Sequence, residues 1–133
     1  MSEEATNSRV SASINEKYLV TSEANGHQTF CDEPEELGGT NQAMDPTELF
    51  LSSLASCKLA TMRMVALRKE WDTSGMRIEL ELVKEEEINT IYQTIYFPDH
   101  LTNEQRDKLV TISHKCPVAK LVTGTVRILD KVI

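Results

Sequence analysis

The chain has 133 residues, a net charge of −7 and 40% hydrophobic residues, which fits one folded domain over residues 1–133 and is too apolar for a disordered protein. The acidic balance works against binding to a nucleic-acid backbone, which requires clustered Lys and Arg. The first residues are acidic and polar where an export signal would be basic and then apolar, and we find no apolar run long enough to cross a membrane. We therefore expect a cytoplasmic protein with neither nucleic acid nor membrane as a partner.

The first thirty residues have the pattern of β-strands. Val10, Ala12 and Ile14 alternate with serines, and an apolar run over residues 18–20 precedes Asn25-Gly26. That dipeptide suits the positive φ angles of a tight hairpin turn. Residues 32–44 contain acidic residues, Pro and Gly without periodicity, which predicts a solvated loop.

A long helix is predicted from Pro46 to about Lys69. Asp45 can act as the N-cap, Pro46 suits the first helical position, and Glu48 occupies the capping-box site, where it serves as a capping residue. Apolar residues cover most of the helix circumference: Leu49, Phe50, Leu51, Leu54, Ala55, Leu59, Ala60, Met62, Met64, Val65 and Leu67. Such a helix must be buried nearly all round, and a short chain has little material to cover it, so we expect a homodimer.

A hairpin and two short helices are predicted to follow. Residues 76–82 alternate between apolar and charged side chains, residues 91–97 are β-branched and aromatic, and residues 85–87 suit the hairpin tip. Thr102 with Gln105 resembles a second capping box.

The predicted chain ends with a Cys-Pro helical turn and a strand. Pro117 ends the preceding helix and suits the first position of a further turn, which would make Cys116 its N-cap. The residues from Val126 to Leu129 predict a last strand.

The three cysteines are the candidate reactive residues. An odd number of cysteines in a chain without an export signal favours catalytic, redox or inert thiols over a disulfide framework. Cys57 lies in an apolar helix, where a thiol is commonly inert, whereas a helix N-terminus would stabilise a Cys116 thiolate. Cys31 ends a strand and is assigned no role. His114 with the two candidate thiols gives only three zinc ligands and no Cys-x-x-Cys pair, so we expect neither a metal nor another cofactor.

Two stretches resemble the OsmC/Ohr family, named for osmotically inducible protein C and organic hydroperoxide resistance. They are Asp45-Pro46-Thr47-Glu48-Leu49-Phe50 followed by Ser56-Cys57, and Ile112-Ser113-His114-Lys115-Cys116-Pro117-Val118. The resemblance implies an α+β fold with antiparallel sheets wrapped around a long central helix, in an intertwined homodimer.

The resemblance also implies a thiol-dependent hydroperoxide reductase. Cys57 would attack a small-molecule peroxide and become a sulfenic acid, and Cys116 would resolve it as a disulfide that an external dithiol reduces. The alternative is a non-catalytic OsmC-like protein that holds a small apolar or thiol ligand at the dimer crevice near Cys57. Both functions stay open at this point.

The sequence departs from the family at the residues that hold the thiolate. Family peroxidases use an Arg from the loop before the helix and a Glu directly after the helix-starting Pro. Here that second position is Thr47, and Glu48 follows one residue late, on roughly the opposite helix face from Cys57.

The expected cation is also missing from its usual place. No Arg or Lys occurs from Tyr18 through Cys57, and the nearest basic residues in sequence are Lys17 and Lys58. A cation would have to come from another element or from a partner chain, and our first candidates are Arg9 and Arg63.

Overall fold

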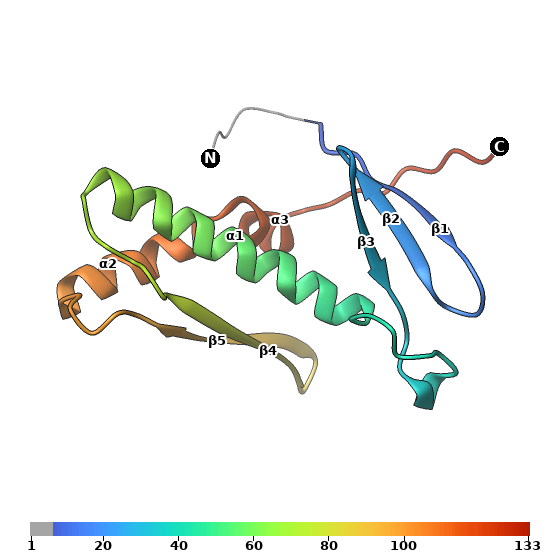
Figure 1. The fold of residues 1–133 in the computed structure, drawn as a ribbon, viewed down its shortest axis with the longest axis horizontal. Helices are drawn as coiled ribbons and strands as arrows, with labels where there is room; N and C mark the ends of the chain where they lie inside the picture. The colour runs from blue at the N-terminus through green and yellow to red at the C-terminus, as the bar shows by residue number, and fades with distance from the viewer. Residues whose placement is uncertain (1–6) are drawn as a thin grey trace. The chain divides into compact units, whose positions relative to one another are not determined.

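The computed structural model describes residues 7–133 and shows an α+β fold with two antiparallel sheets (Figure 1). Its elements are β1 (Ser11–Ile14), β2 (Val20–Ala24), β3 (His27–Cys31), a 3₁₀ turn η1 (Glu35–Leu37), α1 (Pro46–Arg68), β4 (Arg77–Glu85), β5 (Ile88–Tyr96), α2 (Asn103–Ser113) and α3 (Pro117–Thr123). The described chain divides into two compact units, one up to Ser52 and one over residues 53–133. The boundary falls within α1, and the expectation of a single domain stays a prediction.

The N-terminal unit contains an antiparallel meander of β1, β2 and β3. Strand β2 pairs with both neighbours, with Ser11 opposite Glu23 and Val20 opposite Cys31. The turn between β2 and β3 is formed by Asn25 and Gly26 at φ angles of 52° and 79°. The turn predicted from this dipeptide is therefore confirmed.

The loop after β3 is more ordered than a solvated loop, because it is built around the buried carboxylate of Asp32. This carboxylate accepts hydrogen bonds from the Glu33 N–H at 2.8 Å, the Thr40 hydroxyl at 2.6 Å and the Gln42 N–H at 3.1 Å. The bond from Thr40 contributes most to holding the pKa of Asp32 below its ordinary value. A Cβ at Gly39 would lie 2.0 Å from the Glu33 carbonyl oxygen, so the fold of the loop requires glycine there.

Helix α1 begins with the predicted capping box. The Asp45 N–H donates to a Glu48 carboxylate oxygen at 2.9 Å, and the Glu48 N–H donates to an Asp45 carboxylate oxygen at 2.8 Å. Glu48 is therefore a capping residue, as its position in the sequence predicts. The helix runs without a break for 23 residues.

The expectation that α1 is buried nearly all round is wrong for the single chain. Its buried residues are Leu54, Cys57, Lys58, Met62 and Ala66. In contrast, Leu67 is 67% exposed. By length and composition alone this helix is apolar enough to cross a membrane, a criterion that the core helix of a soluble protein also meets. Lys58 and Arg63, both within it, donate hydrogen bonds to their own chain.

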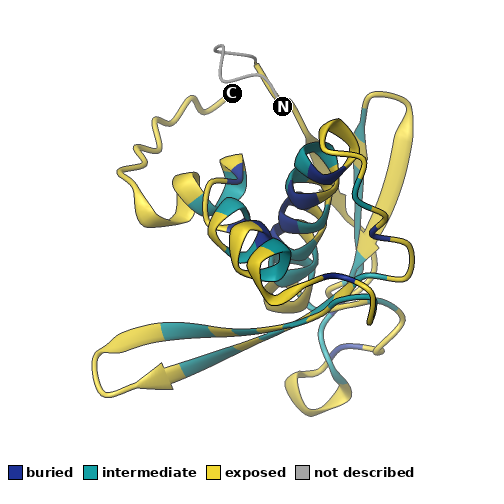
Figure 2. Cartoon of the chain, turned by 90° about the vertical axis from the view of Figure 1, so that its left-hand side faces the viewer, coloured by how far each residue is buried: buried dark blue, intermediate teal, exposed yellow. Residues whose placement is uncertain are grey.

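The C-terminal unit packs α1 against α2 and one face of the β4–β5 hairpin. Met62 and Ala66 of α1 form a core with Leu101 and Leu109, and Ile95 of β5 packs against this core. Figure 2 shows buried residues where α1 and α2 lie side by side. The predicted capping box of α2 is confirmed, since the side chains of Thr102 and Gln105 each accept a backbone N–H of the other residue.

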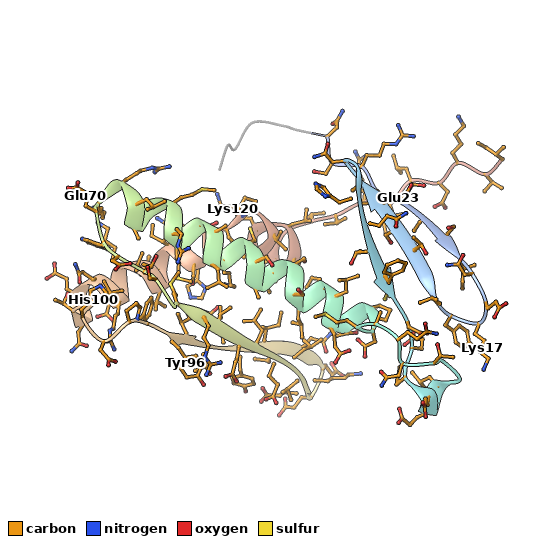
Figure 3. All side chains as sticks on the ribbon, viewed as in Figure 1. Lys17, Glu23, Glu70, Tyr96, His100 and Lys120 are labelled. Atoms are coloured by element: carbon orange, nitrogen blue, oxygen red, sulfur yellow. The ribbon has the colours of Figure 1, made fainter. Side chains whose placement is uncertain are left out.

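The β4–β5 hairpin has one packed and one exposed face. Ile78 is opposite Ile95 and Leu82 is opposite Ile91 in the antiparallel register, and the turn follows Glu85 as predicted. On the exposed face the Arg77 guanidinium lies 3.8 Å from the ring centre of Tyr96, which is labelled in Figure 3. The alternation along β4 predicts this two-sided character.

The predicted last strand over Val126–Leu129 is wrong. After α3 the chain has no regular structure, and no strand within residues 7–133 pairs with it. A strand needs a neighbour to satisfy its N–H and C=O groups, and the single chain provides none here. The apolar side chains of this segment are accordingly exposed, with Ile128 at 86%.

We predict that Asp32→Asn lowers the free energy of unfolding by about 1–3 kcal/mol near neutral pH, because an amide cannot accept all three hydrogen bonds. The exposed Glu36 of the same loop is a matched control, and Glu36→Gln should change stability by less than about 0.5 kcal/mol. Urea unfolding measures both effects.

The contribution of the Asp32 carboxylate to the free energy of unfolding should depend on pH. Because the folded pKa of Asp32 is lowered, its stabilisation is present above the unfolded carboxyl pKa of about 4 and is lost as the pH falls through the folded value. The gap between wild type and Asp32→Asn should therefore narrow in acid. A gap that stays constant with pH would contradict the assignment.

Candidate functional site

The structure brings Cys57 and Cys116 into one buried cluster within the C-terminal unit. Both thiols belong to the same apolar group as Leu54 of α1, and partly buried hydrophobic residues close around them: Leu80, Ile91, Val118 and Ala119. Cys57 is 7% exposed and Cys116 is fully buried. Two residues that lie 59 positions apart in sequence thus share one small apolar space.

Cys116 is positioned by the start of α3, where it is the N-cap that the sequence predicts. Its sulfur accepts a hydrogen bond from the Ala119 N–H at 3.3 Å, and Pro117 occupies the first helical position. The backbone donor points at the sulfur and stabilises negative charge there.

The surroundings of Cys116 shift its pKa in opposing directions. Burial raises the pKa of Cys116, and its hydrogen bond to Cys57 raises it further, while the Ala119 N–H and the charge of Lys58 act in the opposite direction. Burial and the neighbouring Cys57 therefore favour the protonated form of Cys116, against the Ala119 N–H and Lys58.

Lys58 completes the site, and we did not select it from the sequence. Its side chain is only 5% exposed, and its Nζ donates a hydrogen bond to the Ser113 carbonyl oxygen at 3.1 Å. Burial lowers the pKa of Lys58, while Cys116 and Cys57 oppose that shift electrostatically. Its position directly after Cys57 in the sequence could have identified Lys58 as a residue of the site. Successive helical residues diverge by about 100°, but the long lysine stem can still carry the ammonium back toward the sulfur.

Ser113 is itself held firmly in place. It is fully buried at the end of α2, where its hydroxyl donates to the Val110 carbonyl at 2.6 Å and accepts from the Gln93 amide of β5 at 3.4 Å. The carbonyl that accepts Lys58 is therefore fixed by both α2 and β5.

The other basic candidates have different surroundings. The Arg63 guanidinium donates to the hydroxyl of Thr73 at 3.1 Å and to its carbonyl at 2.9 Å, so it fastens the turn before β4. Arg9 belongs to the N-terminal unit, where it lines a surface pocket with Glu23 and Gln28. Glu23 accepts a hydrogen bond from Gln28 at 2.8 Å and is labelled in Figure 3.

Three further predicted residues lie in the N-terminal unit. Thr47 and Glu48 are exposed in the first turn of α1. Cys31 is partly buried at the end of β3, where burial, followed by the negative charges of Glu33 and Asp45, raises its pKa. These surroundings disfavour a Cys31 thiolate.

Comparison with known proteins identifies the fold. The family model described as OsmC-like protein matches residues 39–129, while no curated protein matches the chain. A structure from Psychrobacter arcticus 273-4, assigned to the osmotic stress and detoxification response, is 23% identical, with 90% of this chain and 89% of that one covered and a TM-score of 0.75.

Two further solved structures have the same fold. An organic hydroperoxide resistance protein OsmC from Legionella pneumophila is 22% identical, covers 92% and 93% of the two chains, and has a TM-score of 0.64. A protein from Vibrio cholerae, assigned to organic hydroperoxide resistance, holds captopril in one of its active sites. It is 21% identical, covers 92% and 88%, and has a TM-score of 0.68.

We predict that Arg63→Met lowers the free energy of unfolding by about 1–3 kcal/mol through its lost bonds to Thr73, yet leaves the alkylation rate of Cys57 unchanged. Arg68→Met, at the exposed end of α1, is the control and should change stability by less than about 0.5 kcal/mol. Alkylation slowed by Arg63→Met in a folded protein would place its guanidinium at the thiol.

Proposed function

The chain belongs to the OsmC-like protein family, and on this premise we propose that it reduces organic hydroperoxides with the thiol pair Cys57 and Cys116. The observation that carries the proposal is the buried cluster that brings Cys57 and Cys116 together beside the charge of Lys58. The Legionella pneumophila structure, named for organic hydroperoxide resistance, supports peroxide as the substrate class.

The proposed reaction has three balanced steps. The Cys57 thiolate attacks the outer oxygen of the hydroperoxide, the O–O bond breaks, and the alkoxide takes a proton from solvent, which leaves a Cys57 sulfenic acid and an alcohol. The Cys116 sulfur then attacks the Cys57 sulfur, which forms the disulfide and releases water. An external dithiol returns two electrons and two protons, and it leaves as its own disulfide.

The surroundings of the two sulfurs support this order of roles. Cys57 is the slightly exposed thiol, whereas Cys116 is fully buried and burial raises its pKa. A peroxide therefore meets Cys57 first. The walls formed by Leu54, Leu80 and Ile91 suit an alkyl group better than a charged substrate.

We further propose that the protein works as a homodimer in the cytosol. Apolar residues on α1 and along the last ten residues stay exposed in the single chain, with Leu67 at 67% and Ile128 at 86%. Exposed apolar surface of this kind is typical of a subunit interface. A second copy would also provide a neighbour for the unpaired backbone around Val126.

The alternative function is non-catalytic binding of a small apolar or thiol ligand near Cys57. It is favoured by the apolar walls of the cluster and by the captopril bound in the Vibrio cholerae structure, since captopril carries a thiol. The two functions differ in one measurable property, because only the reductase consumes peroxide.

We predict that cumene hydroperoxide is consumed in the presence of a dithiol, and that Cys57→Ser abolishes this consumption. Mass spectrometry of the oxidised protein should show Cys57 linked to Cys116 within one chain, with Cys31 free. Cys31→Ser is the control and should retain full activity. A bridge through Cys31 would remove Cys116 from the resolving role, and no peroxide consumption at any pH would favour the binding protein.

We also predict that sedimentation shows two chains per particle. Leu67→Glu should shift the population toward monomer and lower the thermal midpoint at a given protein concentration, because a buried carboxylate opposes association. Leu37→Glu is a matched control, since Leu37 in η1 has a similar exposure of 65%. A folded wild-type monomer at all concentrations would overturn the dimer.

A further inference from the structure

A lysine buried against two thiols needs a source of negative charge. Lys58 is 5% exposed, and its hydrogen-bond acceptor, the Ser113 carbonyl, is neutral. Within residues 7–133 no carboxylate forms an ion pair with it, and the groups that interact with its charge are Cys116 and Cys57. Lysine is almost never this buried unless it is paired. The anion available to it is therefore a thiolate.

We propose that Lys58 is the shared cation of the site, which stabilises the Cys57 thiolate before peroxide attack and the Cys116 thiolate after it. The proposal rests on the proposed function and adds a third residue to the cysteine pair. In this chain Lys58 takes the place of the Arg that is absent between Tyr18 and Cys57.

The charges around Cys116 explain why Lys58 would stabilise first the Cys57 thiolate and then the Cys116 thiolate. While Cys57 is a thiolate, its negative charge opposes ionisation of the neighbouring Cys116 thiol. Once Cys57 is a sulfenic acid it is neutral, and the repulsion that opposed ionisation of Cys116 is gone. Lys58 and the Ala119 N–H remain, and both stabilise a Cys116 thiolate.

The second step, closure of the disulfide, then needs no charged residue other than Lys58. The Cys116 thiolate attacks the Cys57 sulfur, the S–O bond breaks, and the leaving hydroxide takes up the proton that Cys116 released, forming water. The titratable groups that face Lys58 are Cys57 from α1 and Cys116 from the start of α3. Helix α2 contributes the uncharged Ser113 carbonyl.

The experiment compares Lys58→Met, Lys58→Gln and Lys58→Arg with the control Lys115→Met. Lys115 is next to Cys116 in sequence, as Lys58 is next to Cys57, but it is exposed. The first step is measured in a Cys116→Ser background by trapping the sulfenic acid with a 1,3-dione. The second is the rate of disulfide closure in the chain that retains both thiols.

We expect Lys58→Met and Lys58→Gln to slow each step about tenfold or more near pH 7, a loss equivalent to about one pH unit of thiolate population. The deficit should shrink above about pH 9, where thiols ionise without help. Lys58→Arg should restore most of the rate, and Lys115→Met should leave both steps unchanged. A purely structural role of Lys58 would produce neither the pH dependence nor the rescue by Arg.

Alkylation of Cys57 by iodoacetamide separates this proposal from the proposed function, because it needs no peroxide. It is measured in a Cys31→Ser, Cys116→Ser background, with circular dichroism to verify folding. Slower alkylation in Lys58→Met with no peroxide consumption by the wild type would refute the reductase but keep Lys58 as the thiolate's cation. Alkylation at the wild-type rate at every pH, or disulfide closure unaffected by loss of Lys58, would overturn the shared cation.

Discussion

The contact on which the site depends is the hydrogen bond from the Lys58 ammonium to the Ser113 carbonyl. That carbonyl is the last of α2, where helical C=O groups lack intrahelical partners and the helix dipole favours positive charge. Three residues later Cys116 begins α3, where the Ala119 N–H favours negative charge on sulfur. The end of one helix therefore holds the cation and the start of the next holds a thiol, and the short connection between them fixes their separation.

The rest of the C-terminal unit surrounds this arrangement with apolar side chains. Met62 and Leu109 lock α1 against α2, and the packed face of the β4–β5 hairpin covers the thiols with Leu80 and Ile91. Electrostatic interactions are stronger in such an apolar space than in water, so the charge of Lys58 acts on both sulfurs more strongly than it would in solvent. The same burial disfavours every charge in the site when it is alone, which couples the ionisation of Lys58 to that of the thiols.

Much of this arrangement follows from local sequence rules. The capping boxes of α1 and α2, the turn at Asn25-Gly26 and the N-cap at Cys116 are short-range features with direct chemical causes, and each forms as the sequence predicts. The buried Asp32 was missed because its partners Thr40 and Gln42 lie in a loop without periodicity. The prediction of a strand near Val126 was wrong for a related reason. A strand depends on a neighbour, which a pattern within one segment does not reveal.

Lys58 was missed because helical geometry assigns adjacent residues to different faces. A lysine carries its charge at the end of a flexible stem, so the position of its Cα says little about where the charge lies. This has a consequence for how the proposed site is assembled. In the proposed site the cation Lys58 and the nucleophile Cys57 are consecutive residues of one helix, so their relative placement does not depend on a separate loop. The acidic segment before α1 can then lack any Arg or Lys, as it does here from Tyr18 to Cys57, without leaving the thiols unpartnered.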